Sequence, residues 1–187
     1  MNNLKNYNLK HRAFVILSLL AESPSGDHAY NINKKIDDRG MRNWTNIGAN
    51  ISLSTIYRIL ERLENDKLVE SIMKKVKNRE KKVYKLSSKG RLILKHKVMY
   101  VLSEFYGKKD EDFYVAFSMF PNLSKEEQIE AFINSINKMK IHKKELEEML
   151  QENSKYPINV TGLFKHPIMI LEADIKFLEW VLIKVQE

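Results

Sequence analysis

The sequence predicts a mainly α-helical fold that contains one small β-hairpin. Only 6 Gly and 4 Pro occur among the 187 residues, which disfavours an all-β architecture. Apolar residues recur at helical spacing through most of the chain, and two short strand patterns stand close together in its first half. The absence of Cys excludes disulfides and thiolate metal sites, so a reducing, cytoplasmic location is expected. No stretch offers the ~18 uninterrupted apolar residues of a membrane span, so we expect no membrane partner.

Basic residues gather in the first half of the chain. Residues 1–106 carry 21 Lys and Arg against 10 Asp and Glu, whereas residues 107–187 carry 11 against 14. The net charge is therefore +11 in the first part and −3 in the second, against +8 for the whole chain. This asymmetry suggests that one part meets a polyanion, although lysine-rich surfaces also simply keep proteins in solution.

Two short helices are expected near the start of the chain. Helical spacing of apolar residues predicts the first over residues 9–22, and the Ser-Pro-Ser-Gly-Asp sequence that follows ends it. The same spacing predicts a second helix over residues 28–38, with Gly40 just after its end. Residues 42–50 are irregular, and we expect Trp44 to fill the core there.

A third helix begins near Ser52 or Ser54, since either hydroxyl can cap its first turn. One face is an apolar stripe made of Leu53, Ile56, Leu60 and Leu63. The other face carries short polar and charged side chains, namely Ser54, Thr55, Tyr57, Arg58, Glu61 and Arg62. This combination is typical of a helix that reads DNA, although a plain solvated amphipathic helix would look similar.

Two strand patterns, over residues 68–73 and 81–87, flank a loop rich in basic residues. Six of the nine residues from 74 to 82 are basic and one is acidic. Like charges placed side by side repel, so folding explains this composition poorly, whereas nearby phosphates would make it favourable. A helix followed by such a hairpin indicates a winged helix-turn-helix. A solvated lysine-rich turn is the alternative interpretation.

The rest of the chain predicts further helices. We expect them over residues 89–106, over the aromatic-rich residues 110–119, over residues 124–152 after a Ser124–Glu127 capping box, and over residues 166–185. The last helix is apolar nearly all round and must be buried on more than one side, which favours a subunit interface. The residues expected in that interface are Ile168, Leu171, Ile175, Leu178, Trp180 and Leu182.

The order and spacing of these motifs resemble the PadR family of transcriptional regulators. Residues 52–70 read SLSTIYRILERLENDKLVE, which supplies the family's Tyr at Tyr57 and its L-x-x-L-E-x-x-G-L-[IV] run. Residues 84–90 match its Y-x-L-T-x-x-G ending, with Ser87 in place of Thr. Lys67 and Ser54 stand where the family usually has Gly, and Lys67 would need a turn that does not depend on a positive φ.

The resemblance implies a winged helix-turn-helix DNA-binding domain with a linking helix over residues 1–106, and a C-terminal helical dimerisation domain over residues 107–187. It implies a homodimeric repressor of pseudo-palindromic double-stranded operator DNA, released by a small hydrophobic or aromatic effector. The expected DNA-binding residues are Ser52, Ser54, Thr55, Tyr57, Arg58, Arg62, Lys74, Lys75, Lys77, Arg79 and Lys81. The alternative function is a winged-helix module that binds an acidic protein partner.

The sequence offers little support for an enzyme. Its 5 His residues lack zinc-binding spacing, and there is neither a Gly-rich phosphate loop nor a G-x-S-x-G motif. We therefore expect no catalytic residues, no metal and no cofactor. An effector cavity could be lined by aromatic and Met side chains, but core packing is the interpretation that we favour for Trp44, Phe113, Phe117, Met119 and Trp180.

Overall fold

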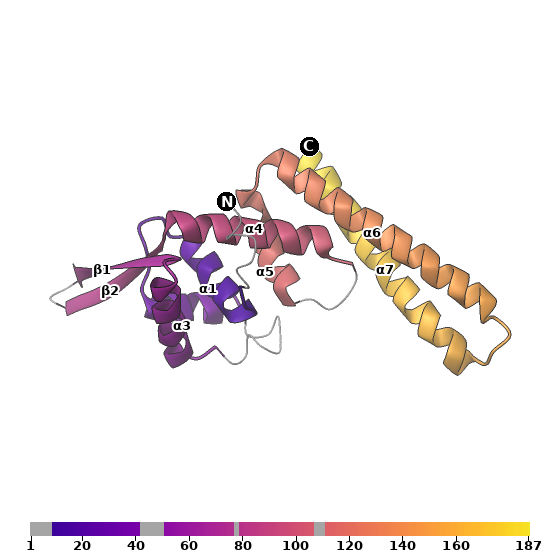
Figure 1. The fold of residues 1–187 in the computed structure, drawn as a ribbon, viewed down its shortest axis with the longest axis horizontal. Helices are drawn as coiled ribbons and strands as arrows, with labels where there is room; N and C mark the ends of the chain where they lie inside the picture. Colours follow the sequence, from indigo (N-terminus) through magenta and orange to yellow (C-terminus); the bar gives the residue numbers. More distant parts are fainter. Residues whose placement is uncertain (1–8, 42–50, 77–78, 107–110) are drawn as a thin grey trace. The chain divides into compact units, whose positions relative to one another are not determined.

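The computed structural model describes residues 9–41, 51–76, 79–106 and 111–187. In this part of the chain, helices dominate and one hairpin is present, which confirms the predicted fold class (Figure 1). The elements in order are α1 (His11–Ala21), α2 (Ala29–Asp38), α3 (Leu53–Asn65), β1 (Val69–Val76), β2 (Arg79–Leu86), α4 (Ser88–Glu104), α5 (Glu111–Met119), the 3₁₀ turn η3 (Phe120–Asn122), α6 (Lys125–Glu152) and α7 (Ile158–Gln186).

Two compact units divide the chain. The first consists of residues up to Val98 together with Tyr114–Met119, and the second of Met99–Phe113 together with Phe120–Glu187. Helices α4 and α5 therefore each contribute residues to both units. The domain boundary after residue 106 stays a prediction.

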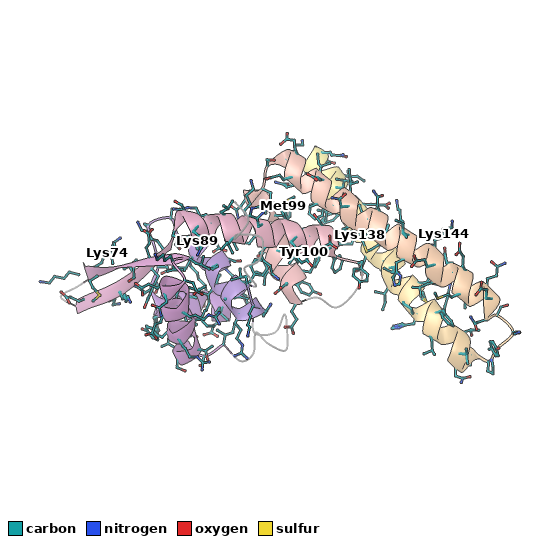
Figure 2. All side chains as sticks on the ribbon, viewed as in Figure 1. Lys74, Lys89, Met99, Tyr100, Lys138 and Lys144 are labelled. Carbon is teal, nitrogen blue, oxygen red and sulfur yellow. The ribbon has the colours of Figure 1, made fainter. Side chains whose placement is uncertain are left out.

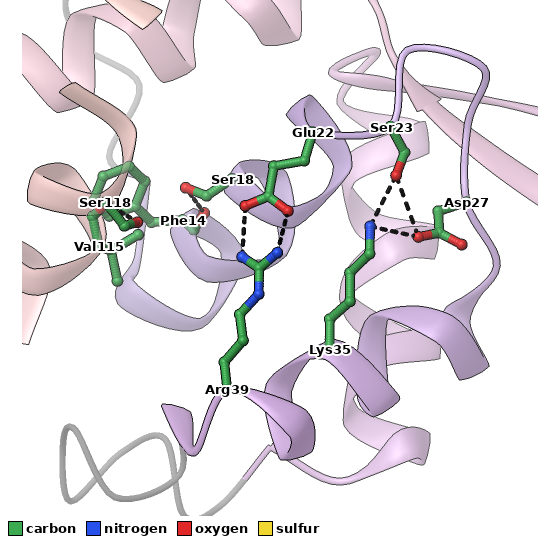
Figure 3. Close-up of polar contacts among 9 residues, drawn as sticks. All are labelled: Phe14, Ser18, Glu22, Ser23, Asp27, Lys35, Arg39, Val115 and Ser118. Carbon is green, nitrogen blue, oxygen red and sulfur yellow. Dashed lines mark hydrogen bonds and ion pairs between the residues drawn. The ribbon is translucent and has the colours of Figure 1, made fainter. Parts of the chain in front are cut away.

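Helix α1 forms the centre of the first unit. Every residue from Ala13 to Leu20 is buried, and α1 packs against α2, α3 and β2. Its one buried hydroxyl, on Ser18, donates a hydrogen bond of 2.9 Å to the carbonyl of Phe14 (Figure 3). The helix can therefore be buried on all sides without leaving a polar side chain unsatisfied.

The hairpin is longer than the sequence pattern indicated. Strands β1 and β2 pair antiparallel from Val69 opposite Leu86 to Val76 opposite Arg79, so residues 74–76 and 79–80, which were predicted as loop, belong to the strands. The side chains of residues 72–75 and 80–82 are exposed, so lysines can extend the ribbon there without being buried. The turn after α1 joins this sheet through two hydrogen bonds of 2.8 Å between the backbones of Asp27 and Tyr84.

The turn from α3 into β1 has a left-handed residue. Lys67 has a φ of 59°, which contradicts the expectation that this turn avoids a positive φ. The N–H of Leu68 donates to the Leu63 carbonyl at 2.8 Å and the N–H of Lys67 donates to Glu64 at 2.9 Å. These two bonds form a Schellman motif, which requires the left-handed backbone whatever side chain is present.

The first turn of α4 packs directly on this turn. The Ser87 hydroxyl donates to the Lys67 carbonyl at 2.7 Å and accepts from the Gly90 N–H at 2.9 Å. A β-carbon on Gly90 would lie 2.0 Å from the Leu68 carbonyl oxygen, so only glycine fits there. Ser87 and Gly90 therefore both act in the contact between the start of α4 and the turn after α3.

A buried ion pair holds α2 to the turn after α1. Asp27 is 7% exposed, and its carboxylate lies 2.8 Å from the Lys35 ammonium and within hydrogen-bond distance of Ser23 (Figure 3). Burial alone would raise the pKa of Asp27, but hydrogen bonds from Lys35, Asn31 and the His28 N–H outweigh it and lower the pKa below 3.8.

In the second unit, α6 and α7 form an antiparallel pair. Ser124 and Glu127 make the expected capping box at the start of α6. Ion pairs between Lys140 and Glu179 at 2.8 Å and between Lys143 and Glu172 at 3.3 Å flank the buried apolar contact. The apolar side chains buried in this unit include Phe132, Met139, Ile168, Leu171, Ile175 and Leu178.

Helix α7 starts eight residues earlier than predicted. It begins at Ile158, after Pro157 as N-cap, and Pro167 lies inside it. Pro167 cannot donate the usual backbone bond to Leu163. Packing along α6 supports the whole helix, so one missing hydrogen bond does not end it. Among the described helices, none is both long and apolar enough to span a membrane.

Replacing Gly90 with Ala should lower the free energy of unfolding by about 2 kcal/mol or more, because the new β-carbon overlaps the Leu68 carbonyl.

Lys67→Gly should raise the free energy of unfolding by roughly 0.5–1 kcal/mol, since glycine adopts the left-handed backbone without a steric penalty. Gly162→Ala is the control, because a β-carbon there meets nothing within 4 Å. Urea unfolding monitored by circular dichroism tests all three. A Gly90→Ala protein as stable as the wild type would contradict the close contact.

The Asp27–Lys35 pair should stabilise the protein only above acid pH. Because folding lowers the pKa of Asp27 below 3.8, the stabilisation is complete above that pH and is lost as the pH falls through the folded-state value. At pH 7 we expect Asp27→Asn to cost about 1–3 kcal/mol in urea unfolding, and the difference from the wild type to shrink below pH 3.8. The control Glu22→Gln removes a more exposed pair with Arg39 and should cost less. A difference independent of pH would refute this role.

Candidate nucleic-acid interface

Three hydroxyl groups cluster at the start of α3. The Ser52 side chain caps the helix by accepting from the Thr55 N–H at 3.2 Å. Its oxygen also lies 2.9 Å from the Ser54 hydroxyl and 3.0 Å from the Thr55 hydroxyl. This part of the chain can therefore offer several O–H and N–H donors to an anion near the helix start.

The two faces of α3 differ as the sequence predicted. Ile56, Leu60 and Leu63 are completely buried, and Leu53 at the first position is half-buried. Arg58, Glu61 and Arg62 are exposed, and Tyr57 is 50% exposed. The helix is thus held by an apolar back, while its outer face is open to another molecule.

A basic groove lies along one side of α3. It has a volume of about 500 Å³ and is lined by Lys10, His11, Arg12, Ala13, Thr55, Arg58, Ile59 and Arg62. The first four come from the start of α1, which is far from α3 in sequence. We name it the α1–α3 groove. Sequence reasoning did not single out its α1 residues, although the run Lys-His-Arg at the beginning of a helix was a signal that could have been used.

The wing carries like charges directly opposite each other. Lys74, which Figure 2 labels on the wing, pairs with Lys81 across the two strands, and Lys75 lies opposite Glu80. The lysines at these positions are exposed. The Lys74 ammonium donates to the Ser25 carbonyl at 3.4 Å. Such a like-charged pair weakens a hairpin, so the folded state alone does not account for it.

The side chains of two other predicted wing contacts, Lys77 and Arg79, are not described by the structure. Lys77 lies outside the described residues, and for Arg79 only the backbone position at the start of β2 is described. Their role as contacts stays a prediction.

Lys82 ties the wing to α3. Its ammonium lies 2.8 Å from the Glu64 carboxylate, which also accepts a hydrogen bond from Ser71. The hydrogen bonds from Lys82 and Ser71 hold the pKa of Glu64 below its usual range, and the same contact raises the pKa of Lys82. This wing lysine is therefore engaged within the protein, unlike the cross-strand pair farther along the hairpin.

The residues expected at a subunit interface divide into two groups. Ile168, Leu171, Ile175 and Leu178 are buried within the protomer, where α7 packs against α6. Trp180 is 56% exposed and Leu182 is half-buried. The large apolar side chains that α7 leaves exposed from its middle onward are Met169, Ile170, Phe177, Trp180 and Ile183, and four of these were not predicted.

The aromatic residues considered for an effector cavity behave differently from one another. Phe113 is buried and stacks on Phe105 with ring centroids 3.9 Å apart, which is core packing. Met119 is buried, Phe117 is half-buried, and Trp180 is largely exposed. Trp44 lies outside the described residues. Within the described residues, His, Asp and Glu side chains form no group of three that could hold a metal ion.

Comparison with known proteins identifies one family. Residues 16–96 match the Transcriptional regulator PadR-like family. No curated protein matches the chain. Similar solved structures include Bacillus subtilis PadR in complex with operator DNA, which is 18% identical, with 92% of this chain and 97% of that chain covered at a TM-score of 0.40. The same protein in complex with p-coumaric acid is also 18% identical, with coverage of 93% and 98% and a TM-score of 0.39.

The residues that match the family include the candidate recognition helix and the wing. Residues 16–96 include α2, α3, both wing strands and the Ser87–Gly90 contact. The family match confirms the resemblance that the motifs indicated: residues 16–96 match the PadR-like family of transcriptional regulators.

Proposed function

We propose that this chain is a homodimeric repressor that binds pseudo-palindromic double-stranded operator DNA. The observation that carries the proposal is the outer face of α3, where exposed arginines follow a cluster of hydroxyls on a helix with a fully buried apolar back. The family match over residues 16–96 supports transcriptional regulation. A recognition helix in the major groove has the same arrangement: its apolar side packs on the domain, and its polar side contacts the bases.

We assign different roles to the residues of this surface. Thr55 and Arg58 contact base edges, because Arg can bind the O6 and N7 atoms of guanine with two hydrogen bonds. Ser52, Ser54, Tyr57 and Arg62 position the helix by donating to phosphates. The wing contributes phosphate contacts through Lys74, Lys75, Lys77, Arg79 and Lys81.

The proposed dimer uses the second apolar stripe of α7, which we define as Met169, Ile170, Phe177 and Trp180. Ile170, Phe177 and Trp180 lie one, eight and eleven residues after Met169, which places all four side chains within roughly 100° of the helix circumference at 3.6 residues per turn. The other stripe is already buried within the protomer, so this one is available to a second copy. A two-fold axis would present two copies of α3 about 34 Å apart, as a palindrome requires.

A small hydrophobic or aromatic effector that releases the DNA belongs to the same proposal. Its support is the family resemblance of the motifs, and no residue is assigned to it. Titration of aromatic compounds into the protein–DNA complex, followed by fluorescence anisotropy of labelled DNA, tests it.

The first experiment is an in vitro selection of bound DNA from a random pool. We expect the wild type to enrich an inverted repeat with half-sites one or two helical turns apart, bound by two protomers. Arg58→Ala should relax the preference at one position of each half-site by about 1–3 kcal/mol. Lys74→Gln with Lys81→Gln should instead weaken binding to all sequences and flatten its salt dependence. A wild type that enriches no sequence, or that prefers an acidic protein to DNA, would exclude the repressor.

The dimer has its own test. Trp180→Glu places a charge at the C-terminal end of the exposed stripe and should convert the protein to monomers in analytical ultracentrifugation, with loss of operator affinity of at least tenfold. Ile141→Glu is the matched control, because Ile141 is 62% exposed on α6 and lies outside the stripe. Dimers that persist in the Trp180 variant would refute the proposed interface.

A further inference from the structure

The α1–α3 groove brings together cationic side chains from two separate helices. Lys10 and Arg12 come from the start of α1, and Arg58 and Arg62 come from the side of α3. His11 and Thr55 complete its polar lining. No acidic side chain is among the described residues that line it, and the first turn of α1 has none.

Folding does not account for this concentration of charge. Among the ion pairs of the described residues, none involves Lys10, Arg12, Arg58 or Arg62. Other basic residues of the same unit are paired, as Lys35 is with Asp27 and Lys82 is with Glu64. Four cations that converge on a concave surface without partners repel each other, and a bound anion would reverse the sign of that interaction.

The groove and the wing lie on opposite sides of α3. Glu64 reaches the wing through Lys82, whereas Thr55 lines the groove. Nine residues separate the two positions, which corresponds to two and a half helical turns and places them on opposite sides of the helix. The exposed face that carries Arg58 lies between them.

This arrangement matches the geometry of the major groove of DNA. A helix inserted there has one phosphate backbone on each side, since the major groove is about 12 Å wide and is bordered by both strands. If the wing follows the backbone on one side, the α1–α3 groove faces the backbone on the other. A concave surface with several cationic donors suits phosphate oxygens better than it suits base edges.

We propose that the α1–α3 groove binds the phosphate backbone on the side of the recognition helix away from the wing, with Lys10 and Arg12 as phosphate contacts. The inference rests on the proposed DNA-binding function. It extends the DNA-binding surface to the start of α1. It also gives Arg58 a position from which its guanidinium borders both the base edges and this backbone.

The test uses the full-length double variant Lys10→Gln with Arg12→Gln. The control, Lys144→Gln with Lys155→Gln, removes two positive charges at exposed positions of the second unit, of which Figure 2 labels Lys144. The logarithm of the dissociation constant is measured against the logarithm of salt concentration for the selected operator and for a scrambled duplex. A dimer that loses four phosphate contacts should lose about 3.6 from the magnitude of the slope on both duplexes, at about 0.9 per contact. The control should keep the wild-type slope.

Neutral methylphosphonate linkages locate the contact on the DNA. We expect one position on the side away from the wing to weaken wild-type binding at least tenfold when it is neutralised, and to have no further effect on the double variant. Lys10→Arg with Arg12→Lys keeps both charges and should keep the wild-type slope, which separates charge from folding. Circular dichroism and thermal unfolding confirm that each variant is folded.

The outcomes separate the two proposals. A wild type that binds no DNA overturns the proposed function. A wild type that selects an operator, together with a double variant whose salt slope and methylphosphonate penalties equal those of the control, overturns only the groove. The groove proposal also fails if the double variant has a flatter salt slope but is still weakened by the neutral linkage. The lost charges would then act at a distance rather than by contact.

Discussion

The first turn of α4 touches the backbone that leaves α3, and the placement of the wing depends on that contact. The Leu68 carbonyl comes so close to Gly90 that no β-carbon fits between them, and Ser87 bridges the two segments through the Lys67 carbonyl and the Gly90 N–H. Strand β1 leaves this point and strand β2 returns to it. Both ends of the hairpin are thus joined where α3 ends, so the direction of the wing is set relative to α3.

A fixed wing lets the two sides of α3 act differently. On one side Glu64 and Lys82 hold the hairpin against the helix, with the carboxylate kept ionised by its hydrogen bonds. On the other side α1, which is buried along most of its length, carries Lys10 and Arg12 to the edge of the groove. Both neighbours of α3 are thus tied to it, which sets the backbone positions of the cations on its two sides.

The parts of this architecture that depend on local sequence could be predicted. The Ser52 and Ser124 caps, the apolar back of α3 and the hairpin itself follow from spacing and residue type within a few positions. The left-handed Lys67 was not expected, because its strain is compensated by two backbone hydrogen bonds and by a serine twenty residues later. The start of α7 was misplaced because Pro157 and Pro167 are both reasonable first residues of a helix, and only packing on α6 decides between them.

The basic groove was missed for a related reason. Lys10 and Arg12 become neighbours of Arg58 and Arg62 only when α1 and α3 pack together, and periodicity within one helix contains no information on that pairing. The wing lysines were found because they are adjacent in sequence as well as in space. A charged site built from one segment is therefore visible in the sequence, whereas a site built from two needs the fold.

Helix α7 is apolar nearly all round because it carries two separate apolar stripes, one buried and one exposed. One stripe, which includes Ile168, Leu171 and Leu178, is buried against α6, so these predicted interface residues are already used within the protomer. The exposed stripe of Met169, Ile170, Phe177 and Trp180 is the surface that we propose for a second copy. Burying the exposed half of eight such side chains would contribute roughly 6–12 kcal/mol, since a full side chain contributes about 1.5–3 kcal/mol. Association costs about 4–15 kcal/mol. The free energy gained by burying the stripe is therefore similar to the cost of association. In the proposed dimer, further contacts or the bound DNA would set the affinity of the two protomers for each other.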